Sequence, residues 1–344
     1  MDRLIDAIAA TDNPSIVGLD PTPALLPEPL LEPVRSVQGV ARARALAESY
    51  LKFNTAIIDA ITGIVPAVKP QIAMYEALGV AGVETYVRTT EYAQQHGLYV
   101  LGDVKRGDIG STAAAYAAHL SGMPVVGSFS EESSQESIDR KDGAEKTAEK
   151  TTGVIDLWHE DAVTVNPYLG VDGILPFVEA ASATDKDIFV LVRTSNPSSS
   201  QLQTLNAEGK AVADHVGDLV EQWGSETQGS FGYSRVGAVV GATHPREGAR
   251  LRESMPHTFF LVPGFGAQGG SAKDVASMFD ASGSGAIVNS SRGIIGAWKK
   301  GAQAHDADAG TVEEALDIVG RSARLAALAM RDSITKELKE RNDH

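Results

Sequence analysis

The fold of this chain is decided by short apolar stretches such as Ile188-Phe189-Val190-Leu191-Val192-Arg193. The stretch is rich in β-branched residues and lacks the strict alternation of apolar and polar residues that a half-exposed strand shows. This pattern is typical of a parallel strand that is buried on both faces. Turn-forming residues follow directly in Thr194-Ser195-Asn196-Pro197. We therefore expect a buried strand whose carboxyl end opens into a polar loop.

Seven further stretches of the same kind divide the rest of the chain. Segments with helical spacing of apolar residues separate them, most clearly at 40–62, 80–96 and 311–331. Eight strands that alternate with helices predict a (β/α)8 TIM barrel, an α/β fold, rather than a doubly wound sheet. The predicted strands are 15–20, a stretch around 67–69, 98–103, 162–166, 188–193, 236–241, 258–263 and 285–289.

One segment does not fit a compact barrel. Residues 127–150 are dominated by Ser, Glu, Asp, Lys and Gln and contain almost no large apolar side chain. Such a composition cannot bury enough apolar surface to form a core of its own. We therefore expect a single barrel domain over 1–344 with a polar surface insertion at 127–150. The insertion is then either disordered or a polar surface helix, and a lid over the site is the alternative.

The composition limits the classes of function. The chain of 344 residues has no cysteine, which excludes disulfides, Cys-ligated metals and a thiol nucleophile. Its 45 acidic and 30 basic residues give a net charge of −15, the opposite of the basic footprint that nucleic-acid binding needs. No stretch approaches the roughly 18 to 20 apolar residues of a membrane helix, and the N-terminal residues lack the pattern of a secretory signal. We therefore expect a cytoplasmic protein that binds neither nucleic acid nor a membrane.

Charged side chains stand where the second and third predicted strands end. The carboxyl ends of barrel strands are where ligand chemistry gathers. The third strand runs into Asp103-Val104-Lys105-Arg106-Gly107-Asp108, and the period of two along a strand places Asp103 and Lys105 on one face. Lys69 comes from the neighbouring strand. These residues predict an alternating charged array of Lys69, Asp103, Lys105 and Asp108; a buried ion-pair network that only supports the fold is the alternative.

Two Gly-rich loops follow the seventh and eighth predicted strands, at 264–270 and 289–293. In a barrel, backbone N–H groups in such loops can approach a phosphate. Arg292 would add a bidentate charge and Gln268 a side-chain donor. The loops predict a ligand with a phosphate monoester, and ordinary tight turns are the alternative. The remaining strand ends carry Asp20, Asn166, Thr194, Ser195, Asn196, Thr243 and His244.

Taken together, these motifs resemble those of orotidine 5′-phosphate decarboxylase. The segment Asp103-x-Lys105-x-x-Asp108-Ile109 resembles the signature of that family, and residues 68–73, 193–197 and 263–270 resemble its longer, type 2 subgroup. Residues 17–21 and 289–293 complete the set, in the expected order along most of the chain. One departure is Gly110, which stands where many members have proline.

The resemblance implies a carboxy-lyase without metal or organic cofactor that converts orotidine 5′-monophosphate to UMP and CO2 in de novo pyrimidine biosynthesis. It also implies a homodimer with shared active sites. Lys69, Asp103 and Lys105 would belong to one subunit's array, and Lys105 would stabilise a carbanion at C6 of the pyrimidine and protonate it. By the same resemblance, Asp108 and Thr112 would reach the partner's site. Asp20 would hold ribose hydroxyls, and Gln268 and Arg292 would hold the phosphate. Thr194 and Ser195 would lie in the substrate site, where Ser195 would bind the edge of the pyrimidine.

Two rival functions fit parts of the pattern. A metal-dependent lyase or aldolase on the same barrel shares the Asp-x-Lys-x-x-Asp pattern, but it places an acid at the end of the second strand, where this chain has Lys69. A non-enzymatic sensor of phosphate ligands would have no reason to keep both lysines and both acids of the array. Loss of activity in EDTA would favour the first rival. Binding of UMP analogues without release of CO2 would favour the second.

Overall fold

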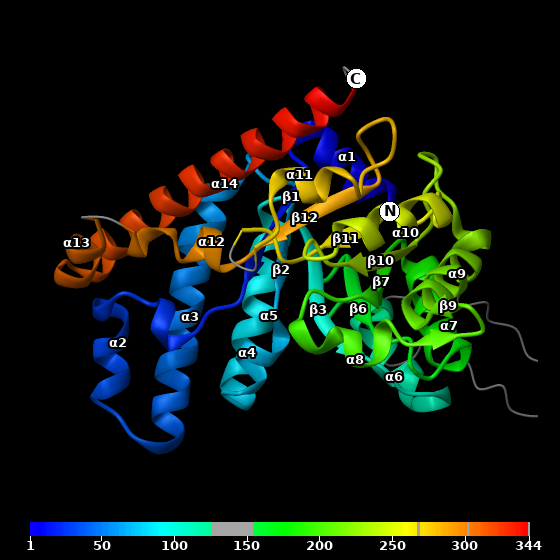
Figure 1. The fold of residues 1–344 in the computed structure, drawn as a ribbon. Helices are drawn as coiled ribbons and strands as arrows, with labels where there is room; N and C mark the ends of the chain where they lie inside the picture. Colours follow the sequence, from blue (N-terminus) through cyan, green and yellow to red (C-terminus); the bar gives the residue numbers. More distant parts are fainter. Residues whose placement is uncertain (125–153, 267–268, 301–302, 343–344) are drawn as a thin grey trace, which may run out of the picture.

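Eight parallel strands close into a barrel in the order β1-β12-β11-β10-β7-β6-β3-β2 (Figure 1). The computed structural model describes residues 1–124, 154–266, 269–300 and 303–342. The sheet is closed because β1 pairs in parallel with both β2 and β12. The predicted barrel is thus confirmed, and every predicted strand falls on a barrel strand. These strands are β1 (Ser15–Leu19), β2 (Ala67–Pro70), β3 (Tyr99–Arg106), β6 (Ala162–Val165), β7 (Asp187–Arg193), β10 (Val236–Val240), β11 (Phe260–Val262) and β12 (Ala286–Ser290).

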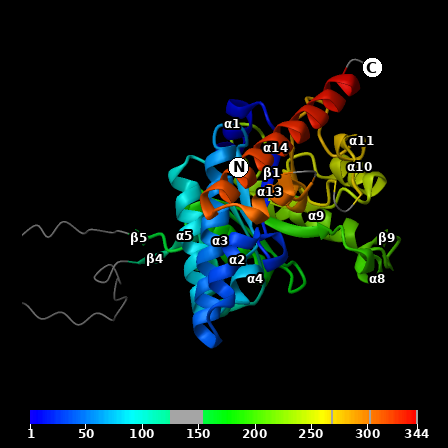
Figure 2. The same ribbon diagram turned by 90° about the vertical axis from the view of Figure 1, so that its left-hand side faces the viewer.

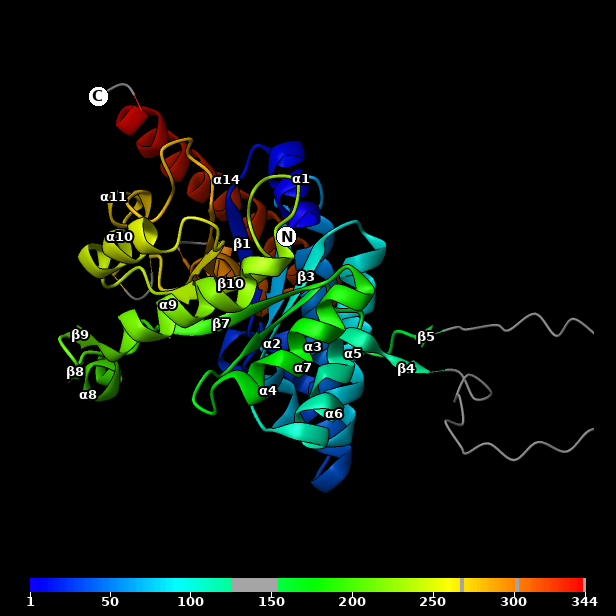
Figure 3. The same cartoon turned by 90° about the vertical axis from the view of Figure 1, so that its right-hand side faces the viewer.

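Helices surround the barrel and return the chain from the end of one strand to the start of the next (Figures 1 and 3). In α3, the buried residues Tyr50, Asn54, Ile57 and Ile61 recur every three or four positions, which gives the helix one face toward the core. The helices are α1 (Asp2–Thr11), α2 (Glu28–Arg35), α3 (Gly39–Ile61), α4 (Ile72–Glu76), α5 (Val80–Gln95), α6 (Gly110–Ser121), α7 (Val171–Thr184), α8 (Ser200–Gln203), α9 (Val212–Gly224), α10 (Pro245–Ser254), α11 (Ala272–Ala276), α12 (Arg292–Ile295), α13 (Gln303–Ala309) and α14 (Val312–Asn342).

The closing helix α14 is longer than the predicted 311–331 and runs on to Asn342. Its apolar stripe continues past the predicted end, because Ile334 and Leu338 are buried at helical spacing. A capping box begins the helix: the Thr311 hydroxyl accepts from Glu314 N at 3.2 Å, and the Glu314 carboxylate accepts from Thr311 N at 2.8 Å. The helix packs across α3, α11 and α12 on one side of the barrel (Figure 1).

Side chains fill the barrel in layers. The layer toward the amino ends of the strands is apolar, and Leu4 of α1 packs against it. Because side chains alternate across a strand with a period of two, the residue two positions further along each strand also faces inward. These side chains form a second layer, which lines a cavity. The lower layer holds Ile16, Ala67, Leu101, Ala162, Phe189, Phe259 and Ile287. The upper layer holds Lys69, Asp103, Thr164, Leu191, Val239, Leu261 and Asn289.

Two small antiparallel ladders lie outside the barrel. The first pairs β4 (Met123–Pro124) with β5 (Val154–Ile155) and leaves the barrel beside α5 (Figures 2 and 3). The second pairs β8 (Asn206–Ala207) with β9 (Lys210–Ala211) between α8 and α9. The predicted insertion at 127–150 lies outside the described residues. None of the helices in the described part of the chain is long and apolar enough to cross a membrane.

Candidate active site

A cavity of about 910 Å³ opens at the carboxyl ends of the barrel strands. Its base is the upper layer of inward side chains, and this base has two chemically distinct halves. The strands β12, β1, β2, β3 and β6 are neighbours in the barrel, so their polar groups form one continuous half. The polar half holds Asn289, Lys69, Asp103 and Thr164, and the apolar half holds Leu261, Val239 and Leu191.

Four donors converge on the carboxylate of Asp103, which is only 7% exposed. Lys69 Nζ lies 2.6 Å from Asp103 Oδ2, and Gln71 Nε2 lies 2.9 Å from the same oxygen. The other oxygen, Oδ1, accepts from Lys105 Nζ and from Thr164 Oγ1, the latter at 3.0 Å. A buried carboxylate needs such charge pairing and hydrogen bonding to stay ionised.

Lys69 and Asp103 favour each other's charged form. Burial by itself raises the pKa of Asp103, but Lys69 and then Lys105 outweigh it, so this pKa lies below its ordinary value. Burial lowers the pKa of Lys69, whereas Asp103 and Asp20 raise it, and the net pKa lies above its ordinary value. Lys105 differs because its side chain is 44% exposed at the cavity. The array is therefore a buried cation, a buried anion and an accessible cation in a row.

Lys105 reaches the cavity by a route that strand periodicity does not predict. The register between β3 and β6 shifts between Gly102 and Arg106, so the ladder is interrupted at this point. Lys105 itself has a φ of +46°, in the left-handed region that residues with a Cβ rarely adopt. Asp103 and Lys105 do meet, but through this irregularity within β3 and the left-handed backbone of Lys105, and not through the predicted alternation along a regular strand.

The loops after β11 and β12 line the same cavity as the charged array. Arg292, the first residue of α12, lines the cavity, as does Gly264. The loop after β11 folds back on itself: Gly264 and Gly266 have φ of +98° and +70°, and Gly266 N donates to Gly270 O at 2.9 Å. Glycine is needed there because other residues rarely adopt this backbone conformation. Gln268 lies outside the described residues.

The predicted ligand-binding residues Asp20, Thr194 and Ser195 also line the cavity. Asp20 Oδ1 is buried and has no hydrogen-bond partner among the described residues. Such an acceptor costs free energy unless a ligand supplies a donor. Gly18 lies on β1, two residues before Asp20. It allows the loop after β12 to approach β1 closely, because a Cβ at Gly18 would lie 1.8 Å from Ser291 Oγ.

Asp108 and Thr112 do not line this cavity within the described part of the chain. Asp108 Oδ1 accepts from Ile109 N at 2.8 Å in the loop between β3 and α6. Thr112 is exposed on the first turn of α6. The structure of one chain therefore brings Lys69, Asp103 and Lys105 together but not these two residues, and their predicted reach into a partner's site stays a prediction.

Sequence reasoning missed the two uncharged donors to Asp103. Gln71 and Thr164 both bind its carboxylate and line the cavity. The sequence points instead to Asn166 at the end of the fourth strand, but Asn166 is exposed and its side chain accepts from Tyr168 N at 3.0 Å. The period of two, counted inward from the strand end, was the signal that would have found Thr164.

The fold and the cavity together define a class of enzyme. A closed parallel barrel that gathers charged side chains at the carboxyl ends of its strands, with Gly-rich loops after the last two strands, is the arrangement of (β/α)8 enzymes that act on small phosphorylated substrates.

Comparison with known proteins is more specific. The chain belongs to the orotidine 5′-phosphate decarboxylase / HUMPS family, whose model matches residues 15–127 and 143–307. It is 43% identical over 298 residues to the orotidine 5′-phosphate decarboxylase of Rhodopirellula baltica, covering 87% of this chain and 88% of that one. It is 36% identical over 340 residues to the enzyme of Clostridium acetobutylicum, covering 98% and 99%. Among solved structures, the OMP decarboxylase of Leishmania donovani matches with a TM-score of 0.65 and 26% identity over 98% of each chain.

Proposed function

We propose that this protein decarboxylates orotidine 5′-monophosphate at the cavity described above, through the array of Lys69, Asp103 and Lys105. It converts this substrate to UMP and CO2, a step of de novo pyrimidine biosynthesis. The observation that carries the proposal is the accessible ammonium of Lys105 beside a buried, ionised Asp103 in a member of this family. A cytoplasmic location belongs to the same proposal and is supported by the cysteine-free composition.

The reaction requires stabilisation of a carbanion. The bond between C6 and the carboxylate carbon breaks, CO2 leaves, and the electron pair stays on C6 in the plane of the ring. No neighbouring carbonyl can delocalise this pair, so fixed charges of the protein must stabilise it. In the proposed mechanism, Lys105 Nζ lies beside C6, stabilises the developing charge and transfers a proton to C6. Its 44% exposure allows it to regain a proton from solvent.

The neighbours of Lys105 hold this ammonium in place before the substrate arrives. Asp103 binds Lys105 Nζ, and Lys69 binds the other oxygen of Asp103 at 2.6 Å. Because these groups are already oriented, little reorganisation is needed when charge develops at C6. The first rival, a metal-dependent lyase, would need an acid where β2 carries the buried cation Lys69. That position therefore supports a mechanism without metal or organic cofactor.

The other parts of the cavity bind and enclose the substrate in this proposal. Leu191, Val239 and Leu261 keep water from the apolar half of the base, which strengthens electrostatic interactions inside the cavity. Asp20 accepts from ribose hydroxyls, and Arg292 binds the phosphate. Phosphate binding far from C6 can still accelerate the reaction if it drives closure of the loops over the substrate.

A homodimer with shared sites is the second part of the proposal. Large apolar side chains are exposed on α6 and α7, two helices that pack together, and just before the first residue of each. They include Ile109 at 52%, Tyr116 at 38%, and Leu169 and Leu175 at 48% and 49% exposed. Exposed apolar side chains that gather in this way mark interaction surfaces. Burial of this face against a second copy would carry Asp108 to the partner's cavity.

Mixing two inactive variants tests the shared site. Asp108→Ala and Lys69→Ala should each be nearly inactive, and activity should return when the subunits exchange. Random exchange makes about half of the dimers mixed, and each mixed dimer has one intact site of two, so recovery should approach about a quarter of wild type. No recovery in samples that mass spectrometry shows to contain mixed dimers would place Asp108 in its own chain's site.

The function itself is tested by incubating the purified protein with orotidine 5′-monophosphate, with and without EDTA. Loss of the ultraviolet absorbance of the substrate, unaffected by EDTA, is the expected result. Turnover that EDTA abolishes would favour the metal-dependent rival. Tight binding of UMP without any turnover of orotidine 5′-monophosphate would favour the sensor.

A further inference from the structure

Thr164, on β6, stands opposite the interruption in the β3–β6 ladder. The ladder pairs Leu101 with Ala162 and Gly102 with Val163, and it resumes only with Arg106 opposite Val165. Thr164 therefore faces the three residues of β3 that leave the regular register. It is 1% exposed at the residue level and points into the polar half of the base of the cavity.

The hydroxyl of Thr164 joins the two reactive parts of the array. Its Oγ1 accepts a hydrogen bond from Lys105 N at 2.9 Å and donates to Asp103 Oδ1 at 3.0 Å. A hydroxyl has one proton to donate and lone pairs to accept with, so both bonds have the correct polarity. One side chain thus holds the backbone of the lysine and the carboxylate that binds the same lysine's ammonium.

This contact matters because the backbone at Lys105 is in an unfavourable conformation. A φ of +46° at a residue with a long side chain costs free energy and persists only where the surroundings enforce it. The hydrogen bond that Lys105 N–H donates to the buried hydroxyl of Thr164 helps to enforce this conformation. Valine would fill the same space but would leave Lys105 N–H and one acceptor site of Asp103 without this partner.

We propose that Thr164 is a positioning residue for the decarboxylation, which sets Lys105 Nζ against C6 of the substrate through the backbone of Lys105 and the carboxylate of Asp103. The inference rests on the proposed function of the cavity. It predicts that loss of the hydroxyl slows the chemical step and leaves the binding of UMP nearly unchanged, because Arg292 and Asp20 hold the phosphate and ribose elsewhere in the cavity.

The test compares Thr164→Val with Thr164→Ser, which keeps the hydroxyl and loses only a methyl group. Thr90→Val is the matched control, since Thr90 is equally buried but its hydroxyl bonds only to the backbone of its own helix, at Tyr86 O and Val87 O. Single-turnover rates with enzyme in excess measure the chemical step without product release. Calorimetric titration with UMP measures binding.

Thr164→Val is expected to slow the single turnover by about 100-fold, the scale of a misplacement near 1 Å. Its Kd for UMP should stay within about threefold of wild type, and Thr164→Ser and Thr90→Val should turn over within about threefold as well. A Thr164→Val enzyme as fast as wild type overturns the inference. So does equal loss in the Ser and Val variants, or a loss of UMP affinity as large as the loss of rate.

Two further arms separate the possible failures. If Thr164→Val does not fold, Thr164→Ala replaces it in the same comparison with Thr164→Ser, and the same outcomes decide. If the wild-type protein does not turn over orotidine 5′-monophosphate at all, the proposed function fails. In that case hydrogen exchange at Lys105 N–H still tests the contact: faster exchange in Thr164→Val than in Thr164→Ser supports the positioning, and equal exchange overturns it.

Discussion

Replacing Asp103 by asparagine removes the central anion of the array while keeping its shape. The Lys69 Nζ–Asp103 Oδ2 distance of 2.6 Å corresponds to about 6 kcal/mol of attraction at an effective dielectric constant of 20. The desolvation of both buried groups offsets part of this attraction. Removing one partner of a buried pair costs about 3–5 kcal/mol, because the other charge is left unpaired. We therefore expect Asp103→Asn to lower the free energy of unfolding by about 4 kcal/mol and to abolish turnover.

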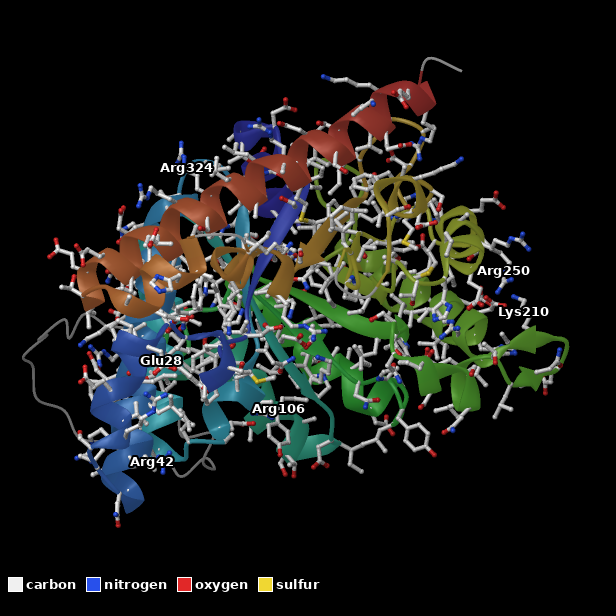
Figure 4. The ribbon with its side chains drawn as sticks, turned by 60° about the vertical axis from the view of Figure 1, so that its left-hand side comes forward. Glu28, Arg42, Arg106, Lys210, Arg250 and Arg324 are labelled. Atoms are coloured by element: carbon white, nitrogen blue, oxygen red, sulfur yellow. The ribbon has the colours of Figure 1, made fainter. Side chains whose placement is uncertain are left out.

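Urea unfolding followed by circular dichroism, at one fixed protein concentration, measures the change. The matched control is Asp218→Asn. Lys210 Nζ lies at the same 2.6 Å from Asp218 Oδ2, but these side chains are 55% and 45% exposed, and Lys210 projects from the β8–β9 hairpin at the edge of the molecule (Figure 4). Water screens this exposed pair, so the control should lose no more than about 1 kcal/mol.

A double variant examines the stated cause. If the cost of Asp103→Asn comes from a stranded ammonium, then adding Lys69→Met should restore at least about 1 kcal/mol, since the apolar side chain needs no partner. Three outcomes would contradict a cost that comes from a stranded ammonium: a loss below about 1 kcal/mol for Asp103→Asn, an equal loss for the surface control, or a larger loss when Lys69→Met is added.

Three further predictions concern pH, the proton donor and the phosphate. The pKa of Asp103 lies below its ordinary value of 3.8, so the ionised carboxylate stabilises the fold above about pH 4 and this stabilisation is lost as the pH falls further. The difference in unfolding free energy between wild type and Asp103→Asn should therefore be constant from about pH 5 to 8 and shrink below about pH 4. A difference that grows in acid would contradict this. Lys105→Ala should lower turnover about a thousandfold or more while UMP still binds in calorimetry, and near-normal turnover would remove Lys105 from its role. Arg292→Ala should raise the Kd for UMP by about 30-fold, or about 2 kcal/mol, and leave that for uridine unchanged; equal affinity of the wild type for UMP and uridine would contradict the phosphate site.

The sequence by itself determined the barrel, because the evidence for it is local. A parallel strand buried on both faces needs an apolar, β-branched run, and this requirement is met in each predicted stretch, as at Ile188–Arg193. The order of strands and helices then leaves few topologies. The charged residues of the array, Lys69, Asp103 and Lys105, could be predicted for the same reason, since they stand at strand ends that a barrel brings to one rim.

The tertiary structure decided which side chains face the cavity and how they meet. Thr164 and Asn166 would share a face by alternation alone, but only Thr164 lines the cavity. The strand β6 ends at Val165, and the side chain of Asn166 instead accepts a hydrogen bond from Tyr168 N in the loop beyond it. The left-handed backbone of Lys105 accompanies a shift of register between β3 and β6. The residue of β6 that binds Lys105 N–H, Thr164, lies 59 residues further along the chain. Local propensity disfavours that conformation, so only contacts between distant segments can stabilise it.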